Sequence, residues 1–245
     1  AEESCRRAIA LAPNFAEADF NLGKALQESR QLEAARDNFA LAIDLKHDFV
    51  DAYLNMANVV RELGDLRKAA TLCESIINLK PDYAEAHNNL GVTLKELGRL
   101  EEAEESCRKA VDLKPDFAEA HSNLGITLKE LGELVDAEKS HAKAISLKSP
   151  FADAHTHMGH TLKELGKLEE AVHHYQHAFA QRTGIQPDED FDVAPATTSL
   201  FFELTNKCNF HCDFCPSDDQ KRDIGFMDFN LSKKLYDEAA NRKIT

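Results

Sequence analysis

An internal repeat of 34 residues constrains this 245-residue chain more than any other feature. An alanine, a leucine or methionine, and a glycine or alanine recur together at that step. The three series are Ala18, Ala52, Ala86, Ala120 and Ala154; Leu22, Met56, Leu90, Leu124 and Met158; and Gly23, Ala57, Gly91, Gly125 and Gly159. A fixed period of this length predicts stacked copies of one supersecondary unit. Five full units occupy 15–184, and 1–14 match the second half of a unit.

Each unit contains two segments in which apolar residues lie three and four apart, which predicts two amphipathic helices. In the third unit we expect helices over about 84–97 and about 100–113, with Gly98 ending the first and Pro115 stopping the second. Small residues such as Ala103 let the two helices approach closely. One hairpin cannot bury its apolar stripe alone, so the units are expected to stack into a mainly α solenoid.

The Leu-Gly pair, the two alanines of the second helix (Ala103 and Ala110) and the closing proline resemble the tetratricopeptide repeat. The resemblance covers 1–184, with a half repeat at 1–14 and five repeats at 15–184. It implies an α-solenoid whose concave groove, lined by the first helix of each unit, binds a protein or peptide. The large aromatic residue usual early in that helix is replaced by Asp19, Tyr53, His87, His121 and His155. Because the chain opens inside a second helix, we expect it to be a fragment of a longer protein.

Four asparagines also step by 34 residues, each directly before the Leu-Gly pair. They are Asn21, Asn55, Asn89 and Asn123, and His157 takes the fifth place. An asparagine amide offers both a donor and an acceptor, so it can pair with both main-chain groups of an extended peptide. This ladder resembles the one in the repeat arm of O-linked N-acetylglucosamine transferases. The other interpretation is that asparagine is simply a common residue in such grooves.

The charge balance limits the partners of the chain. It holds 29 Lys and Arg against 43 Asp and Glu, a net charge of −14. Nucleic acid and anionic membranes require a basic face, so we expect neither as a partner. No apolar run of about 18 residues exists, so we expect no membrane span.

A glycosyltransferase is disfavoured because the C-terminal sequence offers nothing for a sugar nucleotide.

Histidines and cysteines inside the repeats have a structural interpretation. His173 and His177 lie four apart, as metal ligands on one helix face do, but no carboxylate or cysteine stands nearby at ligand spacing. We therefore expect the histidines of the last repeat to be exposed solenoid residues; they are His155, His157, His160, His173, His174 and His177. Cys5, Cys73 and Cys107 share one second-helix position with Phe39 and Tyr175, which predicts small core hydrophobes.

After Gly184 the periodicity stops. The segment 185–198 is acidic and carries two prolines, which indicates a linker, and 199–205 is a short aromatic run with strand character. A loop follows, and a helix is expected over about 230–243. Three cysteines lie on that loop with the spacing C-x₃-C-x₂-C: Cys208, Cys212 and Cys215. Thiolates are soft ligands for iron–sulfur clusters.

This segment resembles the radical S-adenosylmethionine (radical SAM) superfamily, whose signature is C-x₃-C-x-aromatic-C with Phe214 here as the aromatic residue. The resemblance implies that the three cysteines hold a 4Fe–4S cluster whose open iron chelates S-adenosylmethionine, with Phe214 near the adenine. Reductive cleavage of that cofactor would give a 5′-deoxyadenosyl radical, with electrons from a low-potential donor. A zinc knuckle that adds His211 to the three cysteines is the alternative.

The expected architecture is therefore a repeat solenoid followed by the first strand, cluster loop and helix of a truncated α/β radical SAM partial barrel at 199–245. The parent protein would be a cytoplasmic radical enzyme whose repeat arm binds a protein or peptide substrate. The chain as given lacks most of the barrel and is expected to be inactive alone. The alternative is a scaffold for protein–protein interaction with a vestigial or zinc-binding C-terminal segment.

Overall fold

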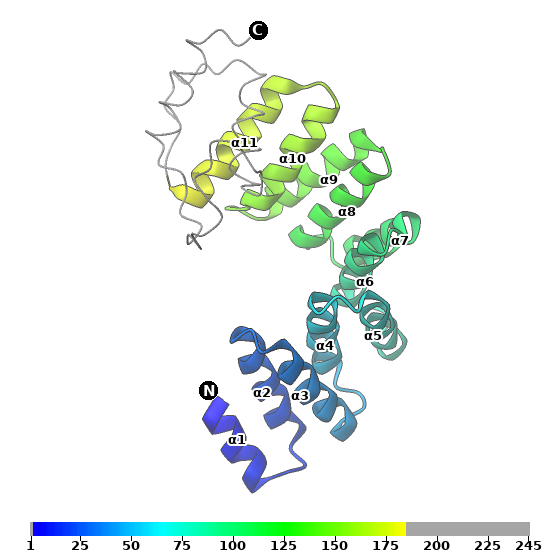
Figure 1. The fold of residues 1–245 in the computed structure, drawn as a ribbon. Coiled ribbons are helices and arrows are strands. Elements are labelled where there is room, and N and C mark those ends of the chain that lie inside the picture. Colours follow the sequence, from blue (N-terminus) through cyan, green and yellow to red (C-terminus); the bar gives the residue numbers. More distant parts are fainter. Residues whose placement is uncertain (1, 185–245) are drawn as a thin grey trace, which may run out of the picture. The chain divides into compact units, whose positions relative to one another are not determined.

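The computed structural model describes residues 2–184 (Figure 1). In this part of the chain eleven α-helices follow one another, and no strand occurs. The helices are α1 (Glu2–Leu11), α2 (Ala16–Glu28), α3 (Leu32–Leu45), α4 (Val50–Glu62), α5 (Leu66–Leu79), α6 (Ala84–Glu96), α7 (Leu100–Leu113), α8 (Ala118–Glu130), α9 (Leu134–Leu147), α10 (Ala152–Glu164) and α11 (Leu168–Thr183). The predicted α-solenoid is confirmed, whereas the predicted linker and radical SAM segment lie outside the described residues.

Each unit is a hairpin of an even-numbered helix and the odd-numbered helix after it. Helix α7 has the predicted bounds, and α6 ends at Glu96, one residue earlier than predicted. The reason is the turn geometry: the Gly98 N–H donates to the Lys95 carbonyl at 2.9 Å, and the Arg99 N–H reaches back to the Leu94 carbonyl at 2.9 Å. This pair of bonds closes a helix when the residue after its C-cap adopts a left-handed conformation, and Gly98 has a φ of 77°.

The two helices of a hairpin approach closely at a glycine of the first helix. A Cβ placed on Gly91 would overlap the sulfur of Cys107 and would lie 3.1 Å from the Ala103 carbonyl oxygen. Ala103 and Cys107 are both fully buried in this contact. The small residues of the repeat are therefore needed for the helix spacing, as the sequence predicts.

A lysine and an aromatic ring connect each unit to the next. The Lys114 ammonium lies 4.9 Å from the centroid of the Phe117 ring and 2.9 Å from a carboxylate oxygen of Glu85. The same stacking occurs at Lys46 on Phe49, Lys80 on Tyr83 and Lys148 on Phe151. An ammonium group over the face of an aromatic ring is attracted by the negative charge density of that face. These repeated contacts favour the same angle between successive units.

The array is curved toward its even-numbered helices. Each of α2, α4, α6 and α8 contacts the next even-numbered helix, whereas no two odd-numbered helices of the described part make such contacts. Between α5 and α7 there is instead an open hollow of about 790 Å³, also lined by His87 and Leu90 of α6. The even-numbered helices therefore form the concave, inner face. Within residues 2–184, no helix has the length and apolar character needed to cross a membrane.

Candidate functional site

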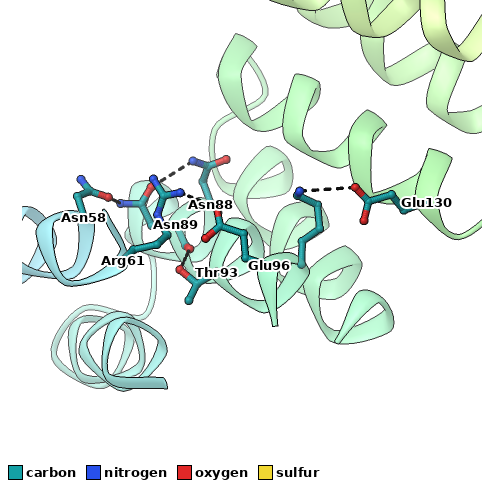
Figure 2. Close-up of polar contacts among 8 residues, drawn as sticks. Asn58, Arg61, Asn88, Asn89, Thr93, Glu96 and Glu130 are labelled. Carbon is teal, nitrogen blue, oxygen red and sulfur yellow. Dashed lines mark hydrogen bonds and ion pairs between the residues drawn. The ribbon is translucent and has the colours of Figure 1, made fainter. Parts of the chain in front are cut away.

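Four asparagines form a continuous chain of amide hydrogen bonds across the inner face, and Figure 2 shows three of them, Asn58, Asn88 and Asn89. Asn123 of α8 donates through Nδ2 to Oδ1 of Asn88 at 2.9 Å, and Asn88 donates to Oδ1 of Asn89 at 3.3 Å. Asn89 of α6 in turn donates to Oδ1 of Asn58 of α4 at 2.9 Å. We call these four residues the amide network. It joins three successive units and orients each amide through its neighbour.

The predicted asparagine ladder divides into two parts in the structure. Asn89 and Asn123 belong to the amide network and are half-buried, so part of each amide stays open to a ligand. Asn55 instead donates to the Asp51 carbonyl of its own helix at 2.8 Å, and Asn21 is exposed near the start of the array. The structure therefore brings together two of the four predicted residues. Whether any of them binds a peptide stays a prediction.

Two members of the amide network were not predicted from the sequence. Asn88 is nearly buried, at 7% exposure, beside Asn89, and Asn58 is one helical turn after Asn55. Residues three apart lie on the same face of a helix, so the position of Asn58 was available as a signal. The partnership of Asn88 with Asn123 depends on how α6 and α8 pack, which the repeat pattern does not specify.

A second series of contacts runs along the inner face beside the amide network. Arg61 pairs with Glu96 at 2.7 Å, as Figure 2 shows, and the pattern recurs one unit later. The later pairs are Lys95 with Glu130 at 3.6 Å and Lys129 with Glu164 at 3.1 Å. Each joins consecutive even-numbered helices. We call these three ion pairs the rungs of the inner face. Each glutamate in them has a basic partner, so the rungs are electrically balanced despite the acidic composition of the chain.

The cysteines of the repeats are confirmed as core residues in two of three cases. Cys73 and Cys107 are fully buried, and burial raises the pKa of both thiols to about 12. Thiols with so high a pKa are inert at neutral pH. Cys5 is only half-buried.

The histidines of the last repeat depart from the prediction of an exposed set. His173 and His177 are exposed, but His155 is 8% exposed and packs against His174. The prediction is therefore wrong for His155, because α11 covers its ring, and it also fails for His157, His160 and His174, which are half-buried. In the described part of the chain, no group of three or more His, Cys, Asp or Glu side chains is arranged to hold a metal ion.

The predicted cluster ligands, Cys208, Cys212 and Cys215, lie outside the described residues, as does Phe214. Their roles stay predictions from the sequence.

Comparison with known families identifies two segments of the array. Models of the tetratricopeptide repeat match residues 84–117 and 152–181. Both segments are tetratricopeptide repeats. The first matched segment comprises α6 and α7, and the second covers α10 and most of α11. Between them lies the α8–α9 unit, which continues the same helix pairing, so the described part of the chain is a mainly α solenoid similar to tetratricopeptide-repeat arrays.

Solved structures share this fold. The chain is 23% identical to YrrB, described as a TPR protein with an unusual peptide-binding site, over 82% of this chain and 98% of that one, with a TM-score of 0.58. TTC0263, a thermophilic TPR protein of Thermus thermophilus, is also 23% identical, over 76% and 99%, with a TM-score of 0.61. The APC/C hetero-tetramer Cut9–Hcn1 matches at 17% identity over 82% and 40%, with a TM-score of 0.69. No curated protein matches the sequence.

Proposed function

We propose that this repeat solenoid is a protein-interaction arm that binds an extended segment of a partner along its inner face, mainly through the partner's main chain. The amide network carries this proposal. Its members hold one another in place, so binding does not have to order four free amide side chains. Fixing a ligand-binding group before the ligand arrives reduces the entropy lost on binding.

The electrical balance of three ion pairs on the inner face supports a main-chain mode of binding. The basic side chains of Arg61, Lys95 and Lys129 are engaged by glutamates of the next unit. A strongly charged peptide would have to compete with these pairs, whereas a neutral extended segment would not. The neutral amides beside them retain donor and acceptor capacity for peptide groups. The solved relative YrrB, with the same fold, is described as having a peptide-binding site.

A peptide selected from a displayed random library on the full 245-residue chain provides a probe of this proposal. If the main chain is recognised, methylating alternate backbone nitrogens of the peptide will weaken binding more than replacing its side chains with alanine. Replacing Asn58, Asn89 and Asn123 with alanine should weaken binding about 2- to 10-fold per lost hydrogen bond. Asn78→Ala, on the opposite face beside the hollow, is the matched control. Equal affinity of the triple variant and wild type would refute the proposal.

We also propose that the protein to which this arm belongs is a cytoplasmic radical SAM enzyme whose substrate is recruited by the arm. The support is the C-x₃-C-x₂-C spacing of Cys208, Cys212 and Cys215 with Phe214 before the last cysteine. Three thiolates suit a 4Fe–4S cluster and leave one iron for S-adenosylmethionine. Such a cluster, once reduced by a low-potential donor, supplies the electron for radical chemistry.

Anaerobic reconstitution with iron and sulfide tests this second proposal. About four irons per chain, lost when the three cysteines are replaced with alanine, are expected. The paramagnetic resonance signal of the reduced sample should change when S-adenosylmethionine is added. Bound zinc with no cluster, lost in a His211→Ala variant, would instead indicate the zinc knuckle and the scaffold interpretation.

A further inference from the structure

Histidines gather where the last two complete repeats meet. Helices α9, α10 and α11 carry His141, His155, His157, His160, His173, His174 and His177. Their rings contact one another: the rings of His141 and His157 stack with centroids 6.0 Å apart, and those of His155 and His174 lie 5.1 Å apart. The contacts of this part of the array are thus made by imidazole side chains, which can each take up a proton.

His141 occupies a site where a proton cannot be accommodated. The ring is fully buried, and neither of its nitrogens has a hydrogen-bond partner among the described residues. It fills the space beside Gly125, where an added Cβ would lie 2.5 Å from the ring. The same position holds Phe39, Cys73, Cys107 and Tyr175 in the other units. A charged imidazole without a partner in such a core is strongly unfavourable, so protonation requires the packing to open.

Two further histidine pairs share a proton. Nδ1 of His155 lies 3.0 Å from Nδ1 of His174, and Nε2 of His173 lies 3.0 Å from Nε2 of His177. A contact of this length holds when one nitrogen donates and the other accepts. When both rings of a pair are fully protonated, both nitrogens are donors and the contact becomes repulsive. Full protonation of both rings would therefore break the hydrogen bond of either pair.

The charged groups that face these rings offset added protons only in part. Lys129 of α8 faces His141 and His157, and Lys95 of α6 also faces His157. Asp153 of α10 favours the charged form of His157, and Glu138 of α9 favours that of His174, but both carboxylates also pair with a basic side chain, Arg182 and Lys167 respectively, at 2.8 Å. In both histidines burial outweighs the carboxylate, and the pKa is lowered.

The histidine pKa values agree with this geometry. Burial, followed by the nearby imidazoles and lysines, lowers the pKa of His141 from 6.5 to about 3. Burial likewise lowers the pKa of His157 and of His174 to about 4. Each proton that only the open form accepts raises the opening constant by nearly tenfold per pH unit below about 6.5.

We propose that α9, α10 and α11 form an acid-sensitive end of the array, which opens when its histidines are protonated while the preceding repeats remain folded. Opening removes α10, and with it the Lys129–Glu164 rung, from the inner face. A partner bound along this end would be released by acidification. The half-buried histidines of earlier repeats differ, because the Nε2 atoms of His87 and His121 lie 3.0 Å from the carbonyl oxygens of Pro81 and Pro115, contacts that a protonated ring retains.

Hydrogen exchange followed by mass spectrometry on the full chain tests this inference, at about pH 7.0 and about pH 5.5 and with correction for intrinsic exchange rates. We expect protection in α9–α11 to fall at least tenfold at the lower pH, with a much smaller fall in α3–α7. At the lower pH, His141→Phe, which copies Phe39, should raise protection in α9–α11 close to tenfold above wild type. His141→Cys, which copies Cys107, is a second variant that removes the same imidazole. His121→Asn is the matched control and should change nothing.

Two results would overturn the inference. One is a parallel loss of protection in α3–α7 and α9–α11. The other is an unchanged acid response when His141 is replaced in a folded variant.

Discussion

Replacing Arg30 with glycine should raise the free energy of unfolding by about 0.5–1 kcal/mol. Arg30 has a φ of 60° in the turn of the first hairpin, where the other hairpins use Gly64, Gly98, Gly132 and Gly166 with φ between 77° and 88°. The left-handed conformation costs a residue with a Cβ about 1–2 kcal/mol. Glycine has more conformational freedom in the unfolded chain, and this lowers the expected stabilisation by about 0.5–1 kcal/mol. The ion pair of Arg30 with Glu62 at 3.3 Å is exposed, so its loss should matter little.

The reverse substitution at an equivalent turn tests the same reasoning with the opposite sign. A Cβ added at Gly98 would meet no atom within 4 Å, so Gly98→Ala isolates the cost of the backbone conformation. We expect Gly98→Ala to lower the free energy of unfolding by about 0.5–1 kcal/mol. Urea denaturation followed by circular dichroism measures both variants. Glu62→Gln, which removes the ion pair without changing the turn, is the control.

If Arg30→Gly destabilises the array while Glu62→Gln is neutral, the conformational argument is refuted. A neutral Gly98→Ala would refute it independently.

Three other substitutions test the core and the inner face. His141→Phe should stabilise the fold by about 1–3 kcal/mol at pH 7, because two unpartnered buried nitrogens disappear. Burial lowers the pKa of His141 in the folded state to about 3. In urea titrations the free energy of unfolding of wild type should therefore fall by about 1.4 kcal/mol for each pH unit below about 6.5, and His141→Phe should not show this loss. Gly91→Ala should destabilise by about 1–2 kcal/mol, because overpacking against the α7 backbone exceeds the helix propensity of alanine; an unchanged thermal midpoint would contradict this. Asn88→Leu, which copies Leu54, should leave the fold intact but weaken binding of the selected peptide; unchanged affinity would remove the amide network from recognition.

The sequence predicted the backbone of the array well because each unit repeats the same local rules. Apolar spacing predicted α7 without error, and a left-handed glycine predicted the end of α6 to within one residue. Both are properties of a few neighbouring residues. The close approach of α6 and α7 was predicted for the same reason, since it follows from small residues at fixed positions, and the structure places Gly91 against Cys107 there.

The side-chain contacts between units were predicted less well, because each depends on two repeats at once. The step of 34 residues placed Asn55 and Asn89 in equivalent positions, yet Asn55 bonds to its own helix and Asn89 bonds to Asn58. The difference arises from the neighbours: Asn88 and Asn123 complete a network around Asn89. Periodicity therefore predicts where an amide lies but not which partner it takes.

The core site at position 141 shows why the units of one solenoid can differ in chemistry. A step of 34 residues from Cys107 marks this position as buried, and the structure confirms the burial. The hairpin accepts Phe39, a cysteine, a histidine or Tyr175 there, each packed against the first helix of its unit. The backbone stays the same although these side chains differ in polarity. The hairpin therefore limits the space available to the side chain at this site more than its polarity. One unit can therefore acquire a titratable core while the inner face continues through it, so acid sensitivity at one end need not disturb the recognition surface at neutral pH.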